Sequence, residues 1–347
     1  MELTKELKEY YQQFSQHGIG DALVQLSSQE VALLICISFF DIYNRFPGSA
    51  DKTIAAIASI PYYDLLDSHI DKLPNISIES TLDYFAEADA FIVSEYSMYL
   101  RKLCDLHRKR FKYRTILKNQ PFPTVEQIGP RSLLEYGNCP TELLFNWMSW
   151  RKWAYDIDNR CAQETAYLFE PILVSCVGGE PISHSRSPVK RIDGQGKPTA
   201  EGRQIDCYIK KGDQQYAYEL KMRVTIAASG QGRLNEEMTF PSEAKKAGII
   251  PVLIVFDPTQ SSLLKKLQAA YIKNNGHVYI GDEAWCHLKT EAGLAMGKFI
   301  EKYIEPPIRT MEASNIVIPY PIKLEATKDS IIISGFRDIK YEIKRHG

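Results

Sequence analysis

Residues 203–221 read Arg203-Gln-Ile-Asp-Cys-Tyr-Ile-Lys-Lys-Gly-Asp-Gln-Gln-Tyr-Ala-Tyr-Glu-Leu-Lys221. Two runs rich in β-branched and aromatic residues lie on either side of Lys210-Lys-Gly-Asp213, which is typical of a turn. A chain that folds back at Gly212 pairs these two runs as neighbouring strands. The stretch therefore predicts a β-hairpin.

Three charged side chains are expected to meet on this hairpin. Because side chains alternate between the two faces of a strand, Glu219 and Lys221 point the same way and Leu220 points to the opposite face. The fold at the turn brings Asp206 alongside that pair. Two carboxylates this close repel each other unless a cation lies between them, and hard oxygen ligands suit Mg²⁺. We therefore predict a Mg²⁺ site formed by Asp206, Glu219 and the backbone carbonyl of Leu220.

The lysine indicates what such a site does. The Lys221 ammonium can position a water or stabilise negative charge that develops on a phosphate. A metal, two acids and a lysine are together suited to hydrolysis of a phosphodiester. We predict that Asp206, Glu219 and Lys221 are catalytic.

These residues resemble the D…(D/E)xK signature of the PD-(D/E)xK nuclease superfamily, most of whose restriction endonucleases hydrolyse DNA with Mg²⁺. The proline of the signature is absent, since Gln204 and Ile205 precede Asp206. Other acid-x-Lys triplets begin at Glu6, Glu243, Asp338 and Glu342. Asp338-Ile-Lys340 is the serious rival because Asp329 precedes it, but too little sequence follows for the remaining elements of a nuclease core.

The elements around the hairpin fit that superfamily. The apolar run 249–256 predicts a strand covered on both faces. Helical patterns and a further strand complete the order α-β-β-α-β-α-β, with helices at 141–177, 235–247 (interrupted by Pro241), 261–275 and 283–303, and the strand at 277–280. The resemblance implies an α/β fold, a restriction-endonuclease-like mixed sheet flanked by helices.

Three regions are expected along the chain. Residues 1–138 show mostly helical patterns, at 2–16, 20–44, 51–57 and 80–117, and end in a proline-rich linker. The nuclease core is assigned to residues 139–305. Residues 306–347 contain strand-like runs at 315–319 and 330–343, which predict a β-rich extension.

A narrower resemblance rests on one segment. The string Val224-Thr-Ile-Ala-Ala-Ser-Gly-Gln-Gly-Arg233, directly after Glu-Leu-Lys-Met-Arg, is similar to the ApaLI-like restriction endonuclease family, type II enzymes that cut a palindrome. The resemblance implies GTGCAC as the target.

Candidate DNA contacts lie in three segments. Arginine, asparagine and glutamine are the usual readers of base edges, and the segment after Lys221 offers Arg223, Ser229, Gln231, Arg233 and Asn235. The glycine- and proline-rich stretch 183–202 predicts a long loop with Arg186, Lys190 and Arg191, which either orders on DNA or is a mobile linker. The basic run 101–118 offers Lys109 and Lys112, and its alternative interpretation is a solvated helix face.

One more acid is expected near the centre, because superfamily members often place a metal-linked glutamate on the helix before the hairpin. Glu164 and Glu170 are the candidates, six residues apart, so one of them faces inward. We prefer Glu164, because Pro171 is expected to end the helix beside Glu170. The alternative for Glu164 is an acid on the helix surface.

Composition sets bounds on the class of protein. Apolar residues make up 44% and charged residues 24% of 347 residues, which is ordinary for a soluble globular protein. No apolar run reaches the roughly 20 residues of a membrane span, and the charged N-terminus lacks the apolar core of a signal peptide. Seven widely spaced cysteines without a CxxC pair are typical of a reduced, cytoplasmic protein. A net charge of −1 argues against a basic protein that coats DNA without sequence preference.

Three function classes follow from these observations. The first is a type II restriction endonuclease on double-stranded DNA, expected as a homodimer because a palindrome matches two-fold symmetry. The second is a structure-specific repair or recombination nuclease with the same catalytic residues. The third is a DNA-binding module on the same fold without activity. The intact set Asp206, Glu219 and Lys221 argues against the third.

Overall fold

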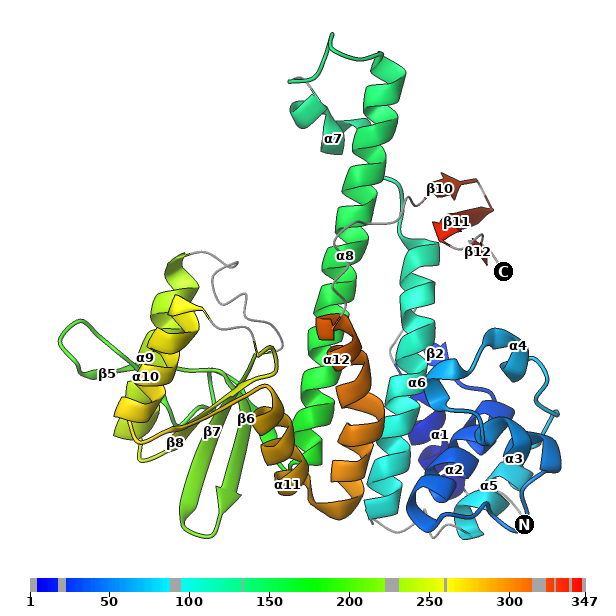
Figure 1. The fold of residues 1–347 in the computed structure, drawn as a ribbon, viewed down its shortest axis with the longest axis horizontal. Coiled ribbons are helices and arrows are strands. Elements are labelled where there is room, and N and C mark those ends of the chain that lie inside the picture. Colours follow the sequence, from blue (N-terminus) through cyan, green and yellow to red (C-terminus); the bar gives the residue numbers. More distant parts are fainter. Residues whose placement is uncertain are drawn as a thin grey trace. The chain divides into compact units, whose positions relative to one another are not determined.

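The structure is a computed structural model that describes residues 5–17, 23–87, 95–132, 134–221, 231–258, 261–313, 323–327, 329–336 and 339–344 (Figure 1). The chain divides into two compact units. The first unit comprises Met1–Leu168 and Ile316–Gly347, and the second comprises Phe169–Asn315. The boundaries expected after residues 138 and 305 therefore fall inside the first and second units rather than between them.

The first unit is mainly helical, as the patterns in residues 1–138 predicted. Its helices are α1 Lys5–Ser15, α2 Ser28–Tyr43, α3 Lys52–Ala58, α4 Asp67–Ile70, α5 Ile78–Glu87, α6 Glu95–Asn119 and α7 Val125–Ser132. A short β1–β2 pair (Gln16–His17 with Val24–Gln25) precedes α2. The Ser27 side chain and Glu30 form a capping box that starts α2, and most of that helix is buried.

The C-terminal residues of the first unit form a small antiparallel sheet. Its strands are β10 Lys323–Ala326, β11 Ser330–Phe336 and β12 Ile339–Lys344, in the order β10-β11-β12. This confirms the strand predicted at 330–343, which the structure divides into β11 and β12. The strand predicted at 315–319 lies outside the described residues, as does Asp338 of the rival triplet.

A five-stranded mixed sheet organises the second unit. The strand order is β3-β6-β7-β8-β9, with β3 Glu180–Ile182, β6 Ile205–Lys211, β7 Gln214–Lys221, β8 Ile250–Val255 and β9 His277–Ile280. The β3, β6 and β7 strands are antiparallel neighbours, whereas β7, β8 and β9 run parallel. The helices are α8 Thr141–Cys176, which the first unit shares, α9 Gln231–Lys246, α10 Ser262–Lys273, α11 Asp282–Phe299 and α12 Glu305–Ala313. The predicted mixed α/β fold is confirmed.

Helices α9 and α10 lie side by side over one face of this sheet (Figure 1). Leu253 and Val255 of β8 pack there with Phe240 of α9 and Leu264 of α10. The register pairs Leu253 with Glu219 and Val255 with Lys221. The same face of the sheet therefore also carries the charged residues of β7. Residues 252–256 are all buried, which confirms the predicted strand covered on both faces.

Two prolines do not end helices as the sequence suggested. Helix α8 continues through Pro171 to Cys176, and α9 continues through Pro241 to Lys246. A proline inside a helix removes one backbone hydrogen bond, that from its own position to the carbonyl four residues earlier. Buried Phe240 and Ala244 hold α9 against the sheet, so packing on the sheet outweighs this local loss.

Two further segments differ from expectation. The stretch 183–202 contains a hairpin, β4 Lys190–Ile192 with β5 Pro198–Gly202, where a long loop was predicted. The helix predicted at 283–303 passes through a π-helical turn, Ile300–Ile304, into α12. Pro306 and Pro307 follow that π-helical turn directly, at the start of α12. The Glu305 N–H bonds to the Ile300 carbonyl five residues earlier, so the prolines fall where the regular i→i−4 hydrogen bonds are already interrupted. Among the described helices, none combines the length and apolar character needed to cross a membrane.

Candidate active site

The predicted hairpin is confirmed, and its register brings the acids together. Antiparallel pairing joins Cys207 to Tyr218 and Lys211 to Gln214, and Gly212 in the turn has a φ of 56°. A positive φ of this kind favours glycine. Continuing the register by one residue places Asp206 opposite Glu219, so both side chains lie on the same face of the sheet.

Asp206 is held by the backbone of the neighbouring strand. Its Oδ2 accepts a hydrogen bond from the N–H of Leu220 at 3.0 Å. Burial raises the pKa of Asp206 well above its ordinary value, and the negative charges of Glu219 and Glu170 raise it further. The Leu220 hydrogen bond and the Lys221 charge oppose that rise only in part. This carboxyl therefore lies where negative charge is in excess.

Lys221 lies between two carboxylates. Its Nζ donates to Glu219 Oε1 at 2.6 Å and pairs with Glu237 Oε1 at 3.0 Å. Burial disfavours the charged ammonium, but the two carboxylates more than offset this and raise the pKa of Lys221 above its ordinary value. Lys221 is therefore a fixed cation in a half-buried position, suited to stabilising charge on a phosphate.

The α8 acid that the structure describes near the centre is Glu170, while the preference for Glu164 stays a prediction. Pro171 does not end α8, so the argument against Glu170 fails. Burial raises the pKa of Glu170, and Glu219 raises it further, which places the two carboxylates within electrostatic reach. The side chain of Glu164 lies outside the described residues.

The residues fit a hard divalent cation. Asp206 and Glu170 are buried and repelled by Glu219, and a bound cation would relieve that repulsion, with carboxylate oxygens as its preferred ligands. Within the described part of the chain, no three acidic, histidine or cysteine side chains form a complete metal cage. A cation here would therefore rest on one or two carboxylates and on substrate phosphate, which is how Mg²⁺ is usually held.

Two residues near the centre were missed by sequence reasoning. Glu237 comes from α9 and pairs with Lys221. Tyr271 of α10 is buried, and burial together with the charges of Glu219, Asp206 and Glu237 raises its pKa well above the ordinary value. No spacing pattern marks either residue, because both reach the hairpin only after α9 and α10 pack on the sheet.

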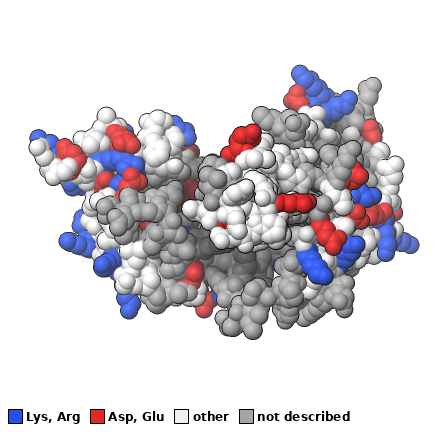
Figure 2. All heavy atoms as spheres, turned by 90° about the horizontal axis from the view of Figure 1, so that it is seen from above, with Lys and Arg blue, Asp and Glu red and all other residues white. Residues whose placement is uncertain are grey.

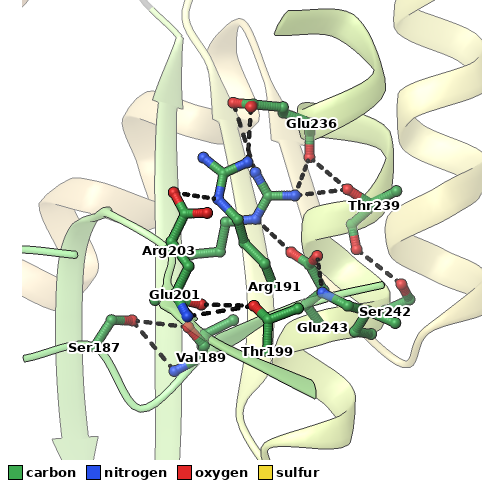
Figure 3. A network of polar contacts seen from close by, with 12 residues as sticks. Ser187, Val189, Arg191, Thr199, Glu201, Arg203, Glu236, Thr239, Ser242 and Glu243 are labelled. Carbon is green, nitrogen blue, oxygen red and sulfur yellow. Dashed lines mark hydrogen bonds and ion pairs between the residues drawn. The ribbon is translucent and has the colours of Figure 1, made fainter. Parts of the chain in front are cut away.

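The predicted DNA contacts of stretch 183–202 fall into two groups. Arg186 lies exposed in a turn, and Lys190 is half-buried in β4. Arg191, by contrast, donates to Glu236 Oε1 at 2.7 Å and pairs with Glu201 Oε1 at 3.2 Å (Figure 3). Its charge is thus used inside the protein, in a polar network that joins β4 and β5 to α9.

Arg203 occupies the centre of the network in Figure 3. It donates to Glu243 Oε2 at 2.5 Å and to Thr239 Oγ1 at 2.7 Å, and both partners lie on α9. The other Glu243 oxygen accepts from the Ile192 N–H at 3.0 Å. Arg203 lies three residues before Asp206, so the network fixes α9 next to the strand that carries the candidate site.

The basic run 101–118 is less exposed than predicted. Lys109 is 8% exposed and lies over the Tyr113 ring. Lys112 is half-buried. Basic and acidic side chains are interspersed on the face shown in Figure 2. Within the run itself, the burial of Lys109 against Tyr113 shows that one of its charges takes part in helix packing.

The remaining predicted readers lie at or beyond the edge of the described residues. Arg223 and Ser229 are outside them. Gln231, Arg233 and Asn235 lie in the first turns of α9, although their side chains are not described. The segment after Lys221 thus leads directly into the helix that supplies Glu237.

Comparison with known proteins gives two matches. A family model described as "ApaLI-like restriction endonuclease" matches residues 63–305. The chain is 46% identical over 253 residues to the type II restriction enzyme ApaLI of Acetobacter pasteurianus, which covers 72% of this chain and 65% of that protein. The chain therefore spans less than two thirds of that relative's length. No solved structure matches the chain significantly.

Proposed function

Because this chain belongs to the ApaLI-like restriction endonuclease family, we propose that it is a type II restriction endonuclease that hydrolyses phosphodiester bonds in double-stranded DNA. The observation that carries the proposal is the face of the β6–β7 hairpin. Asp206, Glu219 and Lys221 lie together there, with Glu170 in electrostatic reach. A module that only binds DNA has no use for acids held against a lysine in this way.

Each residue has a distinct task in this proposal. Asp206, Glu219 and the Leu220 carbonyl would hold Mg²⁺, with Glu170 adding negative charge. When bound, the cation would supply Lewis-acid stabilisation of the phosphate. Lys221 contributes a fixed positive charge beside the scissile group, and its third N–H is available for a phosphate oxygen because two are directed at carboxylates.

The proposed target is a palindrome, GTGCAC, cut by a cytoplasmic homodimer. A two-fold symmetric dimer presents the same residues to both halves of a palindrome. We assign base reading to Arg223, Ser229, Gln231, Arg233 and Asn235, because that segment leaves the strand that holds Lys221. Lys112, Arg186 and Lys190 remain candidates for phosphate contact. Sedimentation of the protein with a duplex carrying the site would measure the stoichiometry, and one chain per site would contradict the dimer.

Digestion of a plasmid of known sequence tests the central proposal. Discrete fragments with Mg²⁺, no cleavage in excess EDTA, and recovery on adding Mg²⁺ back are the expected results. Ca²⁺ should support binding with little hydrolysis, because its looser coordination misplaces the reacting groups. A smear, or a preference for branched over linear duplex, would favour a non-specific or structure-specific nuclease instead. Full activity in EDTA would overturn the metal mechanism.

Two substitutions separate binding from chemistry. Asp206→Ala and Lys221→Ala should each abolish cleavage while Ca²⁺-supported DNA binding and the folded state persist, because the acids, cation and ammonium act as one unit. Lys340→Ala, in the rival triplet on β12, is the matched control and should still cut. If the control were inactive and Asp206→Ala active, the site would be assigned to the wrong sheet.

Specificity has its own test. Replacing Arg233 or Gln231 should weaken binding to the target more than to random DNA, by about 1–3 kcal/mol of discrimination for a base-edge contact. Replacing Lys112 should weaken both about equally and reduce the salt dependence. Equal loss for both DNAs in the Arg233 variant would show that this segment is not a reader.

A further inference from the structure

The Lys221 ammonium has two carboxylate partners that come from different elements. Glu219 lies two residues earlier on β7, and Glu237 lies on α9. The Nζ–O distances are 2.6 Å to Glu219 and 3.0 Å to Glu237. The three side chains are similarly enclosed, with 18%, 20% and 15% of the Lys221, Glu219 and Glu237 side chains exposed. Lys221 is thus held from the strand and from the helix at once.

The two partners are not equivalent in the proposed reaction. Glu219 is a proposed ligand of the cation, and an ammonium paired with it competes for the same carboxylate. Glu237 offers Lys221 a second acceptor away from β7. Its other oxygen, Oε2, is buried and has no hydrogen-bond partner among the described residues. Within the described part of the chain, the Glu237 carboxylate therefore pairs with Lys221 through Oε1 alone.

Helix α9 is fixed firmly enough for Glu237 to hold that position. Its neighbour Glu236 pairs with Arg191 and Arg203, and Glu243 forms a buried pair with Arg203 (Figure 3). Arg203 also donates to the Glu236 carbonyl at 3.3 Å, close to where Pro241 leaves the Glu237 carbonyl without its usual helical donor. These contacts fix the backbone of Glu237 relative to β6 and β7.

We propose that Glu237 is a positioning residue that draws the Lys221 ammonium away from Glu219, so that Glu219 is free for the cation while Lys221 faces the phosphate. This rests on the proposed function, since it assigns separate tasks to Glu219 and Lys221 in the same site. Glu237 acts on the cation only through Lys221. Its effect should therefore vanish when Lys221 is removed.

A double-mutant cycle on Mn²⁺ binding, measured by calorimetry without DNA, tests this directly. Glu237→Gln keeps the size of the side chain but removes its charge, so Lys221 turns wholly to Glu219. The Kd for Mn²⁺ should rise about 10-fold, because Mn²⁺ must then displace a charge-assisted hydrogen bond from Lys221 to Glu219. In the Lys221→Ala background, where Glu219 is already free, Glu237→Gln should change that Kd less than about 2-fold.

The control is Glu283→Gln, which removes the same charge from an exposed position on α11, outside the contacts that hold α9. It should leave the Kd for Mn²⁺ unchanged. An equal rise for Glu237→Gln in both backgrounds would overturn the proposal, because Glu237 would then act on the cation directly. No rise in either background would overturn it as well. Should Glu237→Gln fail to fold, Glu237→Asp keeps the charge but withdraws it from Lys221 and should give a smaller rise.

Cleavage supplies a second readout. Glu237→Gln should lower kcat about 10- to 100-fold with little change in KM or in Ca²⁺-supported DNA binding, since the loss affects the reacting geometry. Glu237→Asp should restore part of kcat. If the unsubstituted protein does not cut DNA, the proposed function fails while the Mn²⁺ cycle can still be read. If it cuts and the cycle is additive, only the role of Glu237 fails.

Discussion

Replacing Glu243 by alanine should destabilise the unit that carries the candidate site far more than a surface substitution on the same helix. Glu243 is 2% exposed and pairs with Arg203, whose side chain is 9% exposed. Its second oxygen accepts the N–H of Ile192. The alanine variant therefore leaves one buried guanidinium with a lost partner and one backbone donor without an acceptor.

The structure allows the magnitude to be worked out. Removing one partner of a buried ion pair costs about 3–5 kcal/mol, because the remaining charge stays buried. Arg203 keeps Thr239 Oγ1 at 2.7 Å and a Glu236 carboxylate oxygen at 3.6 Å, which offset part of that cost. We expect a loss of about 3 kcal/mol in the free energy of unfolding of the second unit.

Hydrogen exchange read by mass spectrometry suits a chain with two units, because peptides from β8 report on the second unit alone. A loss of about 3 kcal/mol corresponds to exchange roughly 100-fold faster at these amides. The matched control is Glu236→Ala, whose side chain is 46% exposed and should cost less than about 1 kcal/mol.

The double variant Arg203→Met/Glu243→Leu sharpens the test. Replacing both charges by apolar groups removes the uncompensated charge, so it should be less destabilised than Glu243→Ala alone. Exchange in Glu243→Ala no faster than in the unsubstituted protein would refute the reasoning. That result would show that the network in Figure 3 does not hold α9 on the sheet.

Three further predictions concern the rest of the chain. Burial, with Arg110 and Arg108 adding to it, lowers the pKa of His107 to about 3. The unfolded chain therefore takes up the proton first as the pH falls below about 6.5, and the first unit should lose about 2 kcal/mol of stability between pH 7 and pH 5. Urea titrations at the two pH values should show this loss in the unsubstituted protein and not in His107→Gln. Gly276→Ala should cost about 1–3 kcal/mol in thermal and urea unfolding, because a Cβ there meets the Pro251 carbonyl oxygen at 2.5 Å; Gly194→Ala, with nothing within 4 Å, should be close to neutral. Exposed Cys286 should react with a thiol reagent before the buried Cys36, Cys104, Cys176 and Cys207, and labelling of any of these four ahead of Cys286 in peptide mass spectrometry would contradict their burial.

The hairpin and its charges could be predicted because their geometry is local. Alternation along a strand and a glycine turn place Asp206, Glu219 and Lys221 on one face whatever the rest of the chain does. The apolar run of β8 likewise predicts a strand that is buried on both faces of the sheet. Both prolines misled the helix predictions, because local propensity is weaker than the burial of residues such as Phe240.

The partners of the charges could not be predicted. Lys109 and Arg191 are both basic residues in the sequence. In the structure Lys109 is buried, and Arg191 is paired with Glu201 and Glu236. Glu170 was set aside for a proline that does not end its helix. In each case the decisive fact is which side chain lies opposite, and that depends on elements distant in the chain.

Residue type and short-range periodicity therefore determined the two strands of the hairpin, its turn, the strand β8 and the shared face of the three charged residues. The tertiary structure alone brought Glu237 to Lys221 across 16 residues of sequence and placed the Arg203 network behind it. The physical reason is the distance along the chain over which each interaction acts. Backbone alternation acts over two residues, whereas an ion pair between a strand and a helix exists only once apolar burial has set how that helix lies on the sheet.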